Sequence, residues 1–178
     1  LFRSADAAQV AVTWRCMLEF VLADEGLTTE RRWYDGEKVL RHVLGFGNEV
    51  MIARLQGSIQ IVASMRDLFG AWAGRYLAHD DDNMTAYAYF LMSPVAAELR
   101  VEGIQQIAKA MTAGADRYLR RRDRIGSTLV ELIEQVLQDK VPNSAEFRSA
   151  ILTIIDALVT NRVPTALALQ DRVRRMKT

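Results

Sequence analysis

The sequence predicts an all-α fold, a single compact bundle of about seven to nine helices. Apolar residues recur at spacings of three and four along almost the whole chain, which is the period of an amphipathic helix. The nearest approach to strand-like alternation, residues 58–62, lies inside a longer helical pattern. Because no repeat of about 20 to 50 residues has agreeing helix lengths, a solenoid is not predicted.

One domain is expected over residues 1–178. The chain is 50% apolar and 25% charged, with 10 glycines and 3 prolines, a composition typical of a globular protein. A chain of this length buries roughly 70% of the surface that its unfolded form exposes, which is enough for one core. Because the first residue is Leu1 and not methionine, the chain can also be a piece of a longer protein.

The first part of the chain predicts three helices. Ser4 can cap the first, which Gly26 stops, and the second covers about residues 28–44 before a turn with two glycines. The third covers residues 48–78 and gives the strongest signal, because its inward positions alternate at spacings of four and three, as in a seam between packed helices. These positions are Met51, Leu55, Ser58, Val62, Met65, Phe69, Trp72 and Tyr76.

The middle of the chain predicts two more helices. Ser93 and Pro94 fit the cap and the first position of a helix that follows a short aromatic segment and ends near Gly114. The next helix is expected over residues 116–138, with Gly126 as the alternative point at which it divides into two.

The C-terminal part predicts two helices joined by a short turn. Asn143, with Glu146 three residues later, is expected to open the first, and Asn161 and Pro164 to end it. The last helix covers about residues 165–176.

Charge, cysteine content and hydropathy exclude several classes of protein. The 23 basic and 22 acidic residues leave a net charge of +1, which argues against a surface built throughout to hold polyanions. Cys16 is the single cysteine, and with His42 and His79 it makes too small a ligand set for structural zinc. We therefore expect a reducing, cytoplasmic compartment and no metal or other cofactor. No apolar run approaches about 18 residues, so we expect no membrane insertion.

The best candidate site lies in residues 116–124, which hold five arginines against two aspartates. On the expected helix, one face beside an apolar stripe carries Arg117, Arg120, Arg121 and Arg124. Since guanidinium groups pair with phosphate oxygens through two hydrogen bonds, such an arginine stripe predicts a polyanion contact. Arg122 falls inside the apolar stripe, where it is expected to extend to the edge or to meet a carboxylate. The functional alternative is an arginine that points toward a partner across a groove.

Ordinary structural roles are the alternative for each of these features. The arginines can form a solvated face that pairs with Asp116, Asp123 or the acidic run 80–82. The basic residues between Arg162 and Lys177 fit the negative end of a helix dipole better than a second basic surface. The aromatic residues between positions 72 and 90 suit a core better than a ligand pocket. His79 and the acidic run lack the alternating ligand spacing of a calcium loop.

No catalytic motif stands out. No glycine-rich loop ends in Lys-Ser or Lys-Thr, and residues 45–50 lack the third glycine of a dinucleotide fingerprint. The sequence therefore indicates a non-catalytic helical interaction or assembly domain that self-associates or binds a protein partner. The alternative is a subunit that binds a nucleic-acid backbone through the arginine stripe.

Overall fold

The computed structural model describes residues 66–79, 83–119, 123–139 and 144–175, together with Val12, Arg15, Cys16 and Glu19. These residues form helices and turns, with no strand among them. The predicted all-α class is therefore confirmed for this part of the chain. The helices are α5 (Arg66–His79), α6 (Asn83–Met92), the 3₁₀ helix η1 (Pro94–Leu99), α7 (Arg100–Leu119), α8 (Asp123–Gln138), α9 (Ala145–Thr160) and α10 (Ala166–Arg175).

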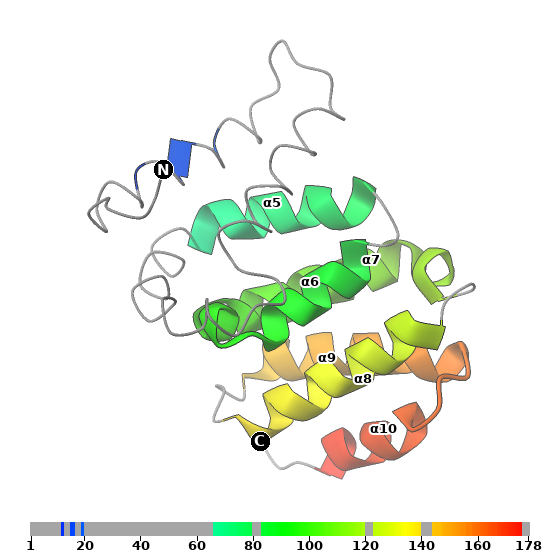
Figure 1. Ribbon diagram of the computed structural model, residues 1–178. Coiled ribbons are helices and arrows are strands. Elements are labelled where there is room, and N and C mark those ends of the chain that lie inside the picture. Colours follow the sequence, from blue (N-terminus) through cyan, green and yellow to red (C-terminus); the bar gives the residue numbers. More distant parts are fainter. Residues whose placement is uncertain are drawn as a thin grey trace.

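The helices pack as a stack of layers (Figure 1). Helix α5 lies at one end of the stack, α6 and α7 follow, α8 and α9 come next, and α10 closes the other end. The most extensive contacts join α7 to α9 and α6 to α8, so each helix of one layer has a partner in the next. Helices α5 and α10 rest mainly on α7 and α9, respectively.

The predicted helices over residues 4–25 and 28–44 lie outside the described residues, apart from four helical positions near residue 16. Helix α5 is the C-terminal part of the predicted helix 48–78, and of the seam positions it contributes Tyr76 to the core, beside Ala73 and Leu77. The total number of helices and the extent of the domain stay predictions. None of the described helices is long and apolar enough to cross a membrane.

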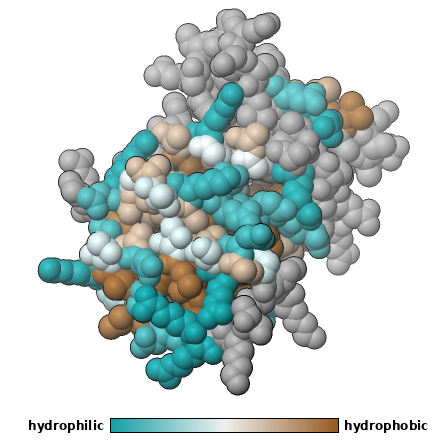
Figure 2. Space-filling view, turned by 180° about the vertical axis from the view of Figure 1, so that it is seen from behind, coloured by the Kyte–Doolittle hydropathy of each residue, from teal (hydrophilic) through white to brown (hydrophobic). Residues whose placement is uncertain are grey.

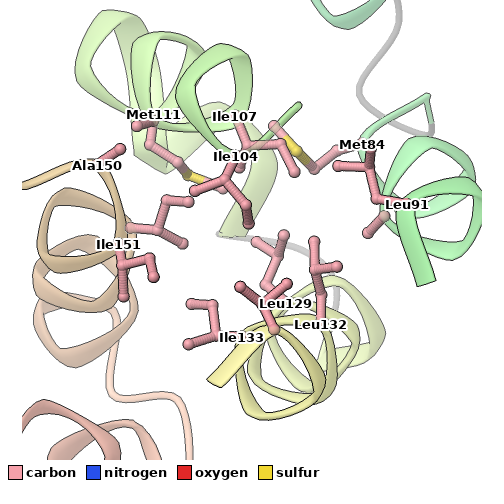
Figure 3. Close-up of a cluster of buried hydrophobic side chains, with 14 of the residues drawn as sticks. Met84, Leu91, Ile104, Ile107, Met111, Leu129, Leu132, Ile133, Ala150 and Ile151 are labelled. Atoms are coloured by element: carbon pink, nitrogen blue, oxygen red, sulfur yellow. The ribbon is translucent and has the colours of Figure 1, made fainter. Parts of the chain in front are cut away.

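The core forms where four helices meet (Figure 3). Helix α7 contributes Ile104, Ile107 and Met111, and all three are buried. Side chains from the other three helices point toward them: Met84 and Leu91 from α6, Leu129, Leu132 and Ile133 from α8, and Ala150 and Ile151 from α9. Burying large aliphatic side chains contributes roughly 1.5 to 3 kcal/mol each, so this cluster is the main source of stability.

Glycine allows the closest approach between α6 and α7. Helix α7 continues through Gly103, which is buried against Leu91. A methyl group at Gly103 would come within 2.6 Å of Leu91 Cδ1 and closer still to Cδ2. Gly126 has the same role in α8, where a methyl group would come within 2.8 Å of Val163. Helix α8 therefore does not divide at Gly126.

The ends of α9 are fixed by two local motifs. The cap is Ser144 and not the predicted Asn143: the Ser144 hydroxyl accepts a hydrogen bond from the backbone N–H of Phe147 at 3.1 Å. At the other end, the N–H of Val163 donates to the carbonyl of Leu158 and that of Arg162 to Val159, a Schellman motif after the predicted stop at Asn161. Arg162 has φ 58° there, in the left-handed region.

We expect alanine to have opposite effects at two glycines of the bundle. Gly103→Ala should lower the free energy of unfolding by about 1 to 3 kcal/mol, because the new methyl group meets the buried Leu91 side chain. Gly74→Ala should raise it by up to about 1 kcal/mol, because this helical glycine is exposed and the nearest neighbour, Gln106 Oε1, lies at 3.5 Å. Urea unfolding followed by circular dichroism measures both. Equal effects of the two substitutions would contradict the packing described for Gly103.

Candidate functional site

The predicted arginine stripe does not lie on one helix. Helix α7 continues past a kink at Gly114 to Leu119, and α8 begins at Asp123. Arg117 is therefore in the last turn of α7 and Arg124 in the first turn of α8, and both are exposed. The predicted single helix over residues 116–138 is wrong. Arg120, Arg121 and Arg122 lie outside the described residues, so their roles stay predictions.

Tyr118 explains why the predicted helix is divided. Its side chain is buried, and its hydroxyl donates a hydrogen bond to the carbonyl of Leu77, in the last turn of α5, at 2.8 Å. The end of α7 is thereby tied to α5, and the ring of Tyr118 joins the same core as Ile125 and Leu129 of α8.

Arg117 and Arg124, the two residues of the arginine stripe that the structure describes, each lie against a tyrosine ring. The guanidinium carbon of Arg117 is 5.6 Å from the ring centroid of its neighbour Tyr118. The guanidinium carbon of Arg124 is 5.8 Å from the ring centroid of Tyr89, which belongs to α6. Arginine within about 6 Å of an aromatic face is attracted to the ring. Arg124 thus links α8 to α6 while remaining exposed to solvent.

Tyr89 is an exposed phenol in an unusual environment. Its side chain is 38% exposed, unlike Tyr87 and Phe90 on the same helix, which are buried. Hydrogen bonding with Thr128, and then with Arg124, holds the pKa of Tyr89 below its ordinary value. Glu131, also on α8, opposes this effect through its negative charge. Tyr89, Arg124, Thr128 and Glu131 form the polar surface that we call the Tyr89 cluster.

The other aromatic residues of this region serve the core, as the sequence favoured. Tyr76, Tyr87 and Phe90 are buried, and the Tyr87 and Phe90 rings lie 6.0 Å apart at an angle of 36°. Burial, with a smaller contribution from Glu102, raises the pKa of Tyr87 well above its ordinary value. The side chain of Trp72 lies outside the described part of the structure.

The basic C-terminal segment contacts α9, and its arginine side chains are exposed. The last turn of α10 contains Arg172, Arg174 and Arg175, where positive charge meets the negative end of the helix dipole. Arg148 of α9 donates to the carbonyls of Val173 and Arg174, at 3.2 and 3.0 Å. Lys177 lies outside the described residues. These contacts agree with the dipole interpretation of the segment.

The acidic run 80–82 and the side chain of His79 also fall outside the described residues. Among the residues that the structure does describe, no three His, Cys, Asp or Glu side chains group as metal ligands would. Cys16 is exposed, in a helical position.

Arg100 is a buried polar residue that the sequence did not predict as important. It is 6% exposed and lies in the first turn of α7. Its Nε donates to the carbonyl of Leu91 at 2.8 Å, and it pairs with the carboxylate of Asp139. A signal was present: Arg100 precedes Ile104 by four residues and Ile107 by seven, so it occupies the apolar stripe of α7.

Comparison of the chain with protein-family models, with curated proteins and with solved structures finds no match. The function must therefore be inferred from the geometry and chemistry of the described residues.

The raised pKa of the buried Tyr87 phenol predicts that the free energy of unfolding falls at alkaline pH. In the unfolded chain its phenol ionises near pH 10, whereas burial keeps it protonated in the folded chain at higher pH. Its contribution to stability is therefore complete below about pH 10 and declines above it, by about 1.4 kcal/mol per pH unit for one proton. Tyr87→Phe should remove this part of the decline. Urea unfolding of both proteins at about pH 9 and pH 11 tests the difference, and equal declines would contradict it.

Proposed function

We propose that this chain is a non-catalytic helical interaction domain that associates with a second copy of itself through the surface of α9 and α10. The supporting observation is an apolar patch on that surface. Leu167, at the start of α10, is 62% exposed, and Leu152 and Val159 of α9 are only partly buried. Figure 2 shows hydrophobic side chains gathered low on the face seen from behind, over α9 and the start of α10.

The patch is held by a well-defined turn. Val163 packs against Gly126, and two residues of the α9–α10 connection, Arg162 and Thr165, have φ values of 58° and 67°. Left-handed conformations cost energy in residues other than glycine and persist only where surrounding contacts impose them. Leu167 is therefore presented to solvent from a fixed turn, which lowers the entropy cost of binding.

The border of the patch carries both signs of charge, which suits pairing with a second copy. Asp156 of α9 accepts a hydrogen bond from Gln170 at 2.5 Å and lies 3.7 Å from Arg174. Asp171 and Arg172 are exposed on α10. A two-fold interface brings the same patch from two chains together, so each arginine can meet an aspartate of the other chain.

Two of the described arginines have structural contacts: Arg66 pairs with Glu98 and Glu102, and Arg148 caps α10. A cytoplasmic location is part of the proposal, since a single cysteine does not depend on an oxidising compartment.

Substitution of Leu167 tests the proposed association. Leu167→Asp should weaken the dimer at least tenfold, because it places a charge in the centre of the apolar patch. Ala71→Asp, an exposed position in α5, is the matched control and should leave the dimer unchanged. Sedimentation velocity over a range of protein concentrations measures both. A strictly monomeric mass of the wild-type chain at high micromolar concentration would contradict self-association, and a dimer insensitive to Leu167→Asp would place the interface elsewhere.

A further inference from the structure

The Tyr89 cluster presents an aromatic ring and a guanidinium group on the surface of α6 and α8, which the proposed self-association through α9 and α10 does not involve. Tyr89 is the exposed aromatic side chain among the described residues, since the other described tyrosines, Tyr76, Tyr87 and Tyr118, are buried. Arg124 lies against its ring, with the guanidinium carbon 5.8 Å from the centroid. An exposed ring and a guanidinium group are thus presented side by side on the surface of α6 and α8.

The packing of α6 against α8 holds the Tyr89 ring and the Arg124 side chain near each other. Helices α6 and α8 pack closely along their length. The hydroxyl of the buried Thr128 donates a hydrogen bond to the backbone carbonyl of Arg124 at 2.8 Å, and the Tyr89 hydroxyl forms hydrogen bonds with the side chains of Thr128 and Arg124. These contacts of Tyr89 restrain the ring and the guanidinium group before any ligand arrives, which reduces the entropy cost of binding.

The cluster contains one cation, Arg124, and one anion, Glu131. Among the side chains that the structure describes, no carboxylate forms a salt bridge with Arg124, so its guanidinium group can donate hydrogen bonds to a phosphate. Arg117, in the last turn of α7, is a second exposed cation beside the connection between α7 and α8. Glu131 is the opposing charge that faces Tyr89 from α8.

We propose that Tyr89 and Arg124 form a contact for single-stranded nucleic acid, in which a base stacks on the exposed part of the Tyr89 ring and a phosphate pairs with Arg124. Stacking on an exposed aromatic side chain requires an unpaired base, which a single strand offers and a duplex does not. Guanidinium groups bind phosphate through two hydrogen bonds. An acidic peptide would use the arginine but would have no base to stack on the ring.

Fluorescence anisotropy with a labelled single-stranded 20-mer, for example oligo(dT), tests this proposal on the full chain. Tyr89→Leu keeps apolar volume against α8 but removes the aromatic face, and should weaken binding about five- to 100-fold. Tyr89→Phe keeps the ring and should bind within about twofold of wild type. Arg124→Gln should weaken binding and lower the salt dependence by about 0.7 in slope, the value for one phosphate contact on a single strand. Glu131→Gln should strengthen binding.

Three results would overturn the proposal. The first is no binding of the wild-type chain to the single strand at low salt, and the second is equal binding by wild type and Tyr89→Leu. The third is binding to poly-glutamate with the same affinity as to the 20-mer, which would identify an acidic protein partner. Leu167→Asp should leave binding to the 20-mer unchanged, so this proposal and the self-association proposal fail independently. Thermal unfolding of each variant confirms that it is folded, and Arg124→Gln, at an exposed position, tests the site without changing the core.

Discussion

The arrangement of α6, α7 and α8 depends on the contacts of one buried side chain, Arg100. A helix leaves its last carbonyls without intrahelical partners, and at the end of α6 Leu91 is buried and Met92 is partly buried. Arg100 supplies the missing donors: Nε bonds to the carbonyl of Leu91, and a terminal nitrogen lies 3.4 Å from the carbonyls of Met92 and Ser93. Its other terminal nitrogen pairs with Asp139, just beyond α8. One side chain thus joins the end of α6, the start of α7 and the end of α8.

This junction also fixes how α6 lies along α8, and the proposed binding surface follows from it. Gln135 of α8 donates to the carbonyl of Met92 at 3.0 Å, which strengthens the tie at the same point. With these ends held together, Tyr89, less than one turn before Leu91, lies beside Arg124 and Thr128 of α8. The exposed ring and its arginine are therefore consequences of a buried polar contact near the opposite end of α8.

Local sequence patterns predicted the features that depend on interactions between residues close together in the sequence. The all-helical class and the end of α9 near Asn161 follow from periodicity and capping, which act within a few residues. The start at Ser93 and Pro94 was predicted only in part, because Pro94 opens the 3₁₀ helix η1 and the α-helix α7 begins at Arg100. Ser144 and Asn143 are equally good caps, so propensity alone could not choose between them. The single helix predicted over residues 116–138 was wrong, and a hydrogen bond from Tyr118 to a residue 41 positions away ties the end of α7 to α5, a contact that local spacing does not reveal. Arg100 lies in the apolar stripe of α7, but its pairing with Asp139, 39 positions away, has no local signal.

The stability of an Arg100→Met variant is the most direct test of this account. Methionine keeps apolar volume but leaves the carbonyls of Leu91, Met92 and Ser93 without their charged donor, so the free energy of unfolding should fall by about 2 to 4 kcal/mol. Arg66→Met, which removes an exposed arginine that pairs with Glu98 and Glu102, should lower it by less than about 1 kcal/mol. Urea unfolding of the three proteins decides the matter. A loss for Arg100→Met no larger than that for Arg66→Met would contradict the central role of Arg100.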